Sequence, residues 1–202
     1  MLARKTPGTI STRRKRDGRS TLPRAHAHDT VNDILNLGCG RKLMKDAVNV
    51  DVSSEVGANV VHDLTKIPWP LPSAAFREVY AFDVIEHLDD IVKAMEEIHR
   101  VCKAGARVRI TVPHFSSGNA FTDPTHRHQL GYFSFDYFDP DHGLAFYSRA
   151  RFKRRQVQLV FTPTLANKIV HRLANRRPAA YEQRWAWIFP AWFLSIDLEA
   201  VK

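Results

Sequence analysis

Cysteine is scarce in this sequence of 202 residues, and its two copies, Cys39 and Cys102, lie in no spacing that zinc sites or disulfide frameworks use. We therefore expect two reduced thiols in a cytoplasmic protein. Long apolar runs are missing too, because the longest candidate, residues 185–196, is shorter than the roughly 18 residues that a membrane helix needs. The N-terminus also has no apolar segment typical of a signal peptide. These features favour a cytoplasmic location, with membrane association only at the surface.

The net charge of +9 is concentrated in two segments of the chain. Residues 1–24 hold eight Lys/Arg and one acid, and residues 149–177 hold nine Lys/Arg and no acid. Such segments suit an anionic ligand or the anionic face of a membrane. Nucleic-acid binding needs a basic face rather than a basic total, so nucleic acid is disfavoured as a partner.

Residues 1–28 lack hydrophobic periodicity and are rich in Arg, Ser, Thr, Gly and Pro, which predicts a basic disordered arm. Residues 29–202 are expected to form one domain. Helical spacing over residues 89–105, with Gly105 as its stop, and short apolar runs on either side favour α/β organisation. The expected strands are 33–37, 47–52, 58–64, 78–85, 106–114, 156–163 and 193–201. We predict a Rossmann-like doubly wound sheet of about seven strands, mostly parallel, with the last strand antiparallel.

The stretch DILNLGCGRK ends a strand with Gly38 and Gly40. Glycine lets the backbone approach a ligand closely because it has no Cβ. A strand that ends in G-x-G is typical of the first turn of a nucleotide-binding sheet. The third glycine of the dinucleotide fingerprint is replaced by Leu43, so NAD and FAD are disfavoured.

Later strand ends supply acids, namely Asp51, then Asp63, then Asp83 with Glu86 and His87. Ligands of open α/β sheets bind beyond the carboxyl ends of the strands. Asp51 is suited to accept hydrogen bonds from both hydroxyls of a ribose, and Asp63 from an adenine amine. No phosphate-binding Lys-Ser/Thr pair accompanies them, so a positively charged nucleoside fits better than a pyrophosphate.

The motifs ILNLGCG, VNVDV, VVHDL and AFDVIEHL, in this order, resemble class I S-adenosylmethionine-dependent methyltransferases, especially the compact group called type 11. The resemblance covers residues 33–115 well and the rest more loosely. It implies S-adenosyl-L-methionine as the cofactor. It also implies that the methionine part of the cofactor contacts Leu37, Gly38, Cys39 and Gly40. The ribose would contact Asp51, and the adenine would contact Val52, Asp63 and Leu64. Phe82 and Asp83 would lie along the sulfonium side. His87 would lie near the methyl group.

One departure from this family is plain, because only ten residues separate Gly40 from Asp51. The first crossover helix must therefore be very short or distorted. Methyltransferases of sugar and glycan biosynthesis often show this contraction, together with P-H-F after the fifth strand and a later D-P-T-H-x-H. The chain has both, in VPHFSS and DPTHRHQLGYFSFDYF.

A second group of polar residues follows the fifth strand, with His114 at its end and a D-P-T-H-R-H segment after it. These groups are suited to recognise and deprotonate a hydroxyl substrate, to hold a metal, or to serve as structural hydrogen-bonding groups. We favour the first interpretation and assign no metal. The expected bases are His87 and His114. The expected substrate contacts are Asp123, His126, His128 and Tyr132.

Residues 168–177 place apolar and basic side chains on different faces of a possible short helix, and Trp185, Trp187 and Trp192 follow. The tryptophans either lie at an interface or close the core, and we favour the core. We expect the chain to methylate a hydroxyl of a sugar, glycan precursor or other small molecule. The alternatives are an RNA methyltransferase and a non-catalytic, methyltransferase-like interaction module.

Overall fold

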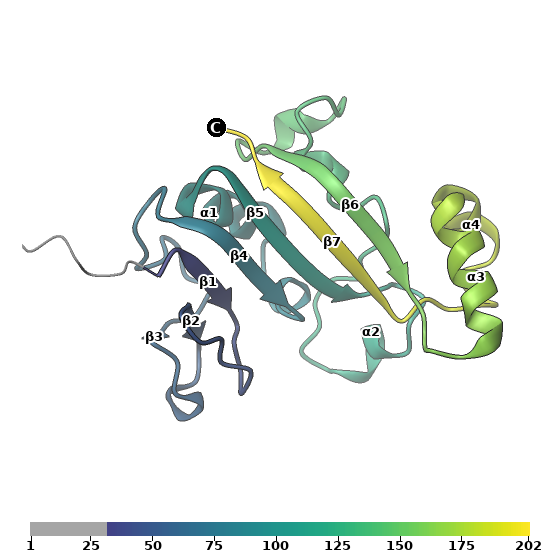
Figure 1. Ribbon diagram of the computed structural model, residues 1–202, viewed down its shortest axis with the longest axis horizontal. Helices are drawn as coiled ribbons and strands as arrows, with labels where there is room; N and C mark the ends of the chain where they lie inside the picture. The colour runs from purple at the N-terminus through teal and green to yellow at the C-terminus, as the bar shows by residue number, and fades with distance from the viewer. Residues whose placement is uncertain (1–31) are drawn as a thin grey trace, which may run out of the picture. The chain divides into compact units, whose positions relative to one another are not determined.

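The computed structural model describes residues 32–202, and all that follows concerns these residues. The predicted arm, residues 1–28, lies outside them, as do residues 29–31 of the predicted domain. Seven strands form one sheet in the order β3-β2-β1-β4-β5-β7-β6 (Figure 1). The strands are β1 (Ile34–Leu37), β2 (Val48–Asp51), β3 (Val60–Val61), β4 (Phe76–Phe82), β5 (Cys102–Pro113), β6 (Phe152–Val160) and β7 (Phe193–Ala200).

Strand β7 runs antiparallel to both of its neighbours, β5 and β6, whereas β1 to β5 pair in parallel. The α/β fold class and the antiparallel last strand are therefore confirmed. The helices are α1 (Ile91–Val101), α2 (Asn119–Thr122), α3 (Leu165–Arg176) and α4 (Pro178–Arg184). Single 3₁₀ turns lie at η1 (Ser54–Val56), η2 (Ile85–His87), η3 (Asp136–Phe138) and η4 (Ala145–Tyr147).

Helix α1 begins after Asp90, whose side chain accepts the backbone N–H of Lys93. This is the N-cap that the acidic pair before the helix predicts. The predicted stop at Gly105 is wrong, because the helix ends at Val101 and β5 starts at the next residue. Gly105 instead lies within the start of β5 with φ +73°.

Strand β6 begins at Phe152, four residues before the strand that the pattern predicts. Its first four residues, FKRR, are mostly charged, which is not typical of a strand. The structure places these arginines on an edge strand, where Arg155 pairs with Glu199 of β7 and Arg154 with Asp136. Charged side chains on an edge strand oppose pairing with other chains, which explains why this strand lacks the apolar alternation.

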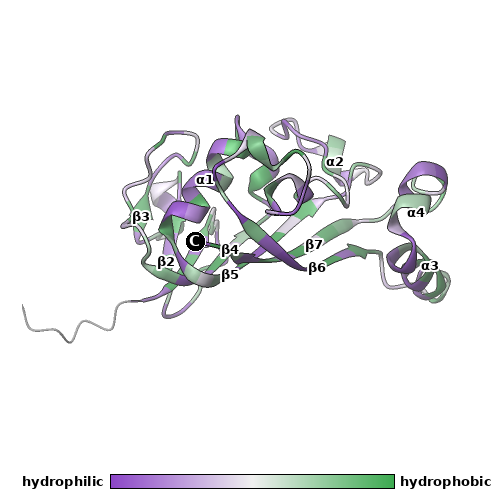
Figure 2. Ribbon diagram, turned by 90° about the horizontal axis from the view of Figure 1, so that it is seen from above, coloured by the Kyte–Doolittle hydropathy of each residue, from purple (hydrophilic) through white to green (hydrophobic). Residues whose placement is uncertain are grey.

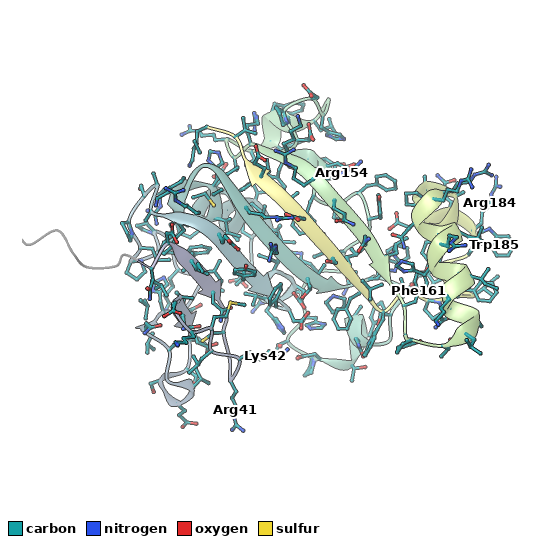
Figure 3. The ribbon with its side chains drawn as sticks, viewed as in Figure 1. Arg41, Lys42, Arg154, Phe161, Arg184 and Trp185 are labelled. Carbon is teal, nitrogen blue, oxygen red and sulfur yellow. The ribbon has the colours of Figure 1, made fainter. Side chains whose placement is uncertain are left out.

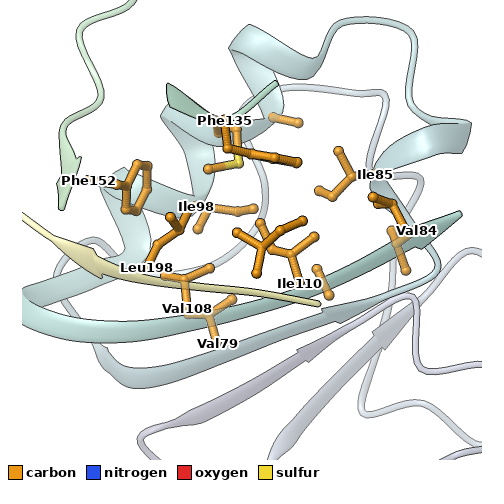
Figure 4. Packing of buried hydrophobic residues seen from close by; sticks show 14 of the residues in the cluster. Val79, Val84, Ile85, Ile98, Val108, Ile110, Phe135, Phe152 and Leu198 are labelled. Carbon is orange, nitrogen blue, oxygen red and sulfur yellow. The ribbon is translucent and has the colours of Figure 1, made fainter. Parts of the chain in front are cut away.

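The core lies between α1 and one face of β4, β5 and β7 (Figure 4). Alternate strand residues such as Val79, Ile110 and Leu198 are at most 1% exposed and pack against Met95 and Ile98. Each such side chain contributes roughly 1.5–3 kcal/mol on burial. Figure 2 shows α1 on this side of the sheet, with α3 and α4 at the end of β6.

The opposite face of these strands is polar and partly exposed. The single Nε–H of Arg107 is shared between the two carboxylate oxygens of Asp197 of β7, at 2.9 and 3.0 Å. Arg109 donates to the hydroxyl of Tyr80, and its guanidinium lies 5.3 Å from that ring centroid. The alternation along each strand thus separates a buried apolar face from a polar face.

Candidate functional site

The two glycines after β1 adopt the left-handed conformation, with φ +56° at Gly38 and +49° at Gly40. A Cβ on Gly38 would overlap the side chain of Val84, whereas a Cβ on Gly40 would meet no atom within 4 Å. Gly38 is therefore required for close packing against the chain after β4. Gly40 leaves open space at the carboxyl edge of the sheet, where a ligand can approach the backbone.

Asp51 ends β2 beside this turn. Its Oδ2 accepts the N–H of Gly40 at 2.7 Å, and its Oδ1 accepts the N–H of Ser53 at 2.9 Å. Two backbone donors hold the carboxylate in one orientation, and each oxygen keeps a further lone pair. The structure thus brings Gly40 and Asp51 together in the arrangement that a ribose-binding role needs.

The connection from β1 to β2 contains no helix within residues 38–47, which agrees with the contraction expected from the sequence. A buried amide pair holds it instead. Asn49 Oδ1 accepts hydrogen bonds from Asn36 Nδ2 and from the N–H of Met44, each at 2.9 Å. Asn49 Nδ2 in turn donates to the carbonyl of Met44 at 3.0 Å. These asparagines were not among the predicted site residues. Two polar residues inside apolar strands are nevertheless a signal of a buried hydrogen-bond network.

The residues predicted to contact the adenine differ in their exposure to solvent. Val52 is 68% exposed and lies at the open edge, whereas Leu64 is only 7% exposed and belongs to the core. Asp63 accepts the N–H and the hydroxyl of Thr65 at 3.0 and 2.7 Å. These hydrogen bonds lower the pKa of Asp63, so it stays ionised. Leu37 is likewise buried, at 1% exposure, beneath the glycine turn.

The chain turns sharply after β4. Asp83 adopts φ +58°, which is uncommon for a residue with a side chain, and its Oδ1 accepts the hydroxyl of Thr111 on β5 at 2.9 Å. Strained backbone of this kind is often found at functional sites. The turn delivers η2, which carries Glu86 and His87 to the same edge of the sheet. Phe82 lies on the polar face, in edge contact with Tyr80 at 5.5 Å.

The segment DPTHRH is held against η2 by backbone hydrogen bonds. The N–H groups of Arg127 and His128 both donate to the carbonyl of Glu86, at 2.8 and 3.3 Å. This pairing places the ring of His126 4.6 Å from the ring of His87, centroid to centroid. A cavity of about 530 Å³ lies here, lined by Asp83, Glu86, His87, Pro113, Asn119, Thr122, Asp123, Pro124, His126 and Phe193.

Four of the predicted site residues thus meet at this cavity: Asp83, His87, Asp123 and His126. Glu86 joins them and is 1% exposed. Burial, together with the negative charges of Asp83 and Asp123, raises the pKa of Glu86 to about 7. The E-H pair at the end of the fourth strand was the available signal for Glu86, which the predicted site omitted.

The three remaining residues that were predicted for catalysis or substrate binding do not line this cavity. His114 is fully buried, with Nδ1 bonded to Ser116 and Nε2 3.1 Å from Glu182 of α4. A base must reach its substrate, and His114 has no exposed surface in this structure, so its role as a base stays a prediction that the structure does not support. His128 bonds the carbonyl of Leu88 through Nε2, and the ring of Tyr132 lies under Arg154 at 5.7 Å. Neither residue lines this cavity, so their contacts with a substrate stay predictions.

Both cysteines are free and buried. Burial and the charge of Asp51 raise the pKa of Cys39, and burial raises the pKa of Cys102 to about 12. The raised pKa values disfavour both thiols as nucleophiles.

Comparison with known proteins gives a family match over part of the chain. Residues 35–110, from β1 into β5, match the family model described as "Methyltransferase domain". This part of the chain is therefore similar to the methyltransferase domains of that family. The matched residues include the glycine turn, Asp51, Glu86 and His87, so the cofactor of the domain is S-adenosylmethionine. No match is found among curated proteins.

Solved structures share the fold of this methyltransferase domain. A SAM-dependent methyltransferase from Archaeoglobus fulgidus is 18% identical, with a TM-score of 0.57 over 82% of this chain and 85% of that one. One from Mesorhizobium loti is 15% identical, with a TM-score of 0.54 over 82% and 89%. A putative methyltransferase in complex with the Trm112 activator of Haloferax volcanii is 14% identical, with a TM-score of 0.55 over 84% and 82%.

Proposed function

We propose that this methyltransferase domain transfers a methyl group from S-adenosylmethionine to a hydroxyl of a sugar, a glycan precursor or another small molecule. The observation that carries the proposal is the cavity beside His87, His126 and Glu86. It lies at the carboxyl ends of β4 and β5, at the same edge of the sheet as the glycine turn. An acceptor there would lie next to a cofactor held at β1 and β2.

The residues of the edge fit the cofactor. The open space at Gly40 allows the methionine part to approach the backbone, and the oriented carboxylate of Asp51 suits the ribose hydroxyls. The acids Asp51 and Asp83 also suit a cation, since a sulfonium carries a positive charge. When bound, S-adenosylmethionine supplies an electrophilic methyl group, so that the C–S bond breaks with its electron pair left on sulfur while the acceptor oxygen gains the new C–O bond.

A hydroxyl acceptor must lose its proton during this step, and the cavity contains groups that can promote the loss. His87 is partly exposed, and its Nδ1 is held by the hydroxyl of Thr125 at 2.9 Å. The ring is therefore oriented, with Nε2 left for another partner. A positioned histidine of this kind is suited to general-base catalysis at neutral pH.

The alternative acceptor, RNA, is less compatible with the cavity. Three acids, Asp83, Glu86 and Asp123, contribute to its lining, and no Lys or Arg does. A phosphate backbone would meet like charge there, whereas neutral hydroxyl groups find acceptors. The charge of the cavity thus favours an uncharged or cationic group near the reacting atom.

The test is turnover of isotopically labelled S-adenosylmethionine by the full chain with separate pools of sugar nucleotides, lipid-linked sugars, small phenols and RNA. We expect label in a product that resists mild base, as a methyl ether does, from one of the hydroxyl pools. His87→Gln should lose most of this turnover but still bind the cofactor. Transfer to RNA alone would overturn the small-molecule acceptor, and transfer to an amine would overturn the hydroxyl assignment.

A further inference from the structure

The strongest unexplained feature of the site is the carboxyl group of Glu86. Its side chain is 1% exposed, and neither oxygen has a hydrogen-bond partner in the part of the chain that the structure describes. Buried carboxyl groups without partners are rare because their desolvation is costly. His126 Nε2 lies 3.9 Å from Oε1 of Glu86, which is too far for a hydrogen bond.

The hydrogen bonds around His87 and His126 define which ring nitrogens carry protons. Thr125 gives its one hydroxyl hydrogen to Asp123 Oδ1 at 2.6 Å, so His87 must donate from Nδ1 to the oxygen of Thr125. His126 Nδ1 faces the carbonyl of Ala120 at 3.3 Å and must also donate. In the neutral rings, both Nε2 atoms therefore have free lone pairs.

Glu86, His87 and His126 can therefore each offer a ligand atom at one place in the site. One ligand atom each from Glu86, His87 and His126 lies within 4.8 Å of the other two. In metal sites the far nitrogen of each histidine is usually held by a carbonyl or by a carboxylate-linked group, which orients the ring. Ala120 and the Thr125–Asp123 pair provide this support here.

We propose that Glu86, His87 and His126 bind one divalent transition-metal ion. Two imidazole nitrogens and one carboxylate suit Zn²⁺, Mn²⁺, Fe²⁺ or Co²⁺ better than Mg²⁺, which prefers oxygen ligands. Three protein ligands leave a coordination position open toward the cavity. This position distinguishes a catalytic site from a closed structural one.

An ion at this site would activate the acceptor directly. This consequence rests on the proposed function. A hydroxyl oxygen that coordinates a divalent cation loses its proton more readily. The proton leaves to water, since Thr122 and Asp123 at the rim of the cavity are exposed. His87 then acts as a ligand rather than as the base, and the cation takes over its role in promoting proton loss.

The test is calorimetric titration of the chelator-treated full chain with Zn²⁺, Mn²⁺ and Mg²⁺, without any acceptor. We expect one equivalent of Zn²⁺ or Mn²⁺ to bind, with Mg²⁺ at least tenfold weaker. Glu86→Gln, which keeps the volume of the side chain, and His126→Ala should each weaken binding by more than tenfold. His128→Gln is the matched control, because His128 lies in the same segment but bonds Leu88.

Co²⁺ gives a second readout, because ligation by histidine produces visible absorption bands that Glu86→Gln should alter. Absence of stoichiometric binding, or binding that both variants leave unchanged, would overturn the site and leave a shared proton between Glu86 and His126. Cofactor binding by each variant reports whether it is folded. Methyl transfer without metal dependence would overturn only the activating role, and metal binding without transfer would count only against the proposed function.

An independent feature lies at the other end of the sheet, on α3 and α4. Leu165, Ile169 and Leu173 form one stripe of α3 and are 62–81% exposed. The loop after α4 exposes Trp185, Trp187, Ile188, Phe189 and Trp192 by 42–69%. Leu173, Trp185 and Phe189 line a groove of about 700 Å³ between the two helices. The prediction that the tryptophans close the core is therefore wrong.

Basic side chains border this apolar surface. Lys168, Arg172 and Arg176 follow a parallel stripe on α3, and Arg177 and Arg184 line the groove with Arg176. None of the five has an ion-pair partner within residues 32–202. Glu182, the one acid in residues 161–192, points to His114. Figure 3 shows Arg184 and Trp185 at the outer side of α4.

We infer that this α3–α4 surface docks on an anionic lipid bilayer. Leucine, isoleucine and tryptophan beside unpaired Lys and Arg are the composition of helices that lie in the membrane interface. Each basic residue near an anionic surface contributes about 1 kcal/mol. No helix within residues 32–202 is long and apolar enough to cross a bilayer. The described part of the chain would therefore bind the membrane from one side.

The test is co-sedimentation of the full chain with vesicles of phosphatidylcholine, with and without phosphatidylglycerol. We expect binding that needs the anionic lipid and that falls at least fivefold in Ile169→Glu and Trp187→Ser. Phe146→Ser is the matched control, because Phe146 is equally exposed, at 71%, but lies on η4. These residues are exposed, so the variants should keep their fold.

Vesicle binding that both variants retain would overturn the inference and point to the basic residues 1–28. The inference would also be overturned by concentration-dependent self-association that the same two variants abolish and that occurs without vesicle binding. In that case the surface contacts a second copy of the chain.

Discussion

Gly40 donates its backbone N–H to Oδ2 of Asp51 at 2.7 Å, across the carboxyl ends of β1 and β2. This bond joins the glycine turn to the acid that follows the next strand. It orients the carboxylate before any ligand binds, and an oriented group loses less entropy on binding. The two features that sequence analysis identified separately thus form one preorganised unit.

Asp51→Ala should weaken S-adenosylmethionine binding by about 3 kcal/mol, or roughly a hundredfold, because two hydrogen bonds to a charged acceptor are lost. Calorimetric titration measures the change. Glu55→Ala is the control, since Glu55 is an exposed acid on the neighbouring η1. An equal loss in both variants would mean that Asp51 acts only through net charge.

Gly38→Ala and Gly40→Ala should differ in their effects. The added Cβ at position 38 would overlap Val84, which predicts destabilisation of about 1–3 kcal/mol by overpacking, in addition to backbone strain. At position 40 the space is open, so the free energy of unfolding should change less in Gly40→Ala, whereas the affinity for the cofactor should fall. Denaturant unfolding and titration separate the two. Val84→Ala should partly rescue Gly38→Ala, and a lack of rescue would assign the loss to backbone strain alone.

Asn49→Leu should destabilise the domain by about 2–4 kcal/mol, because it leaves the buried amide of Asn36 and the N–H of Met44 without their acceptor. Urea unfolding is the measurement. Asn32→Ala is the control, since Asn32 is exposed and precedes β1. An effect no larger than that of the control would show that the helix-free connection does not depend on these amides.

The pKa of Glu97 predicts that the domain loses stability at acidic pH. Burial alone would raise its pKa, but hydrogen bonds from Arg100 and from the N–H of Trp69 outweigh this and lower the pKa. A lowered pKa in the folded state means that the stabilisation is present above the pKa of the unfolded chain, about 4.3. It is lost as the pH falls through the folded value.

Unfolding free energies measured between neutral and acidic pH should therefore fall less steeply in Glu97→Gln than in the wild type. At neutral pH the variant should be the less stable of the two, because the ion pair with Arg100 is gone. Parallel pH profiles for the two proteins would contradict this assignment.

Much of the domain follows from local patterns in the sequence. Alternation of apolar residues predicts the strands, because successive side chains of a strand point to opposite faces. The glycines before Arg41 and the acids after β2 and β4 mark the carboxyl edge, since parallel strands all end there. These patterns were sufficient for the fold class, and the resemblance to a known family then indicated the cofactor.

The tertiary structure decided which histidines meet. His114 and His126 lie twelve residues apart and look alike in the sequence. Yet α4 covers His114 through Glu182, while the carbonyl of Glu86 holds Arg127 and His128, the residues after His126, against η2. Whether a polar side chain faces a cavity or the interior depends on elements distant in the chain.

The same reason applies to the C-terminal helices. The sequence by itself indicated a short basic amphipathic helix over residues 168–177, and α3, Leu165–Arg176, confirms a helix there. It did not determine what lies against the apolar stripe. Burial is a property of neighbours, and α3 and α4 lie at the end of the sheet, where Leu165, Ile169 and Trp187 meet solvent instead of the core.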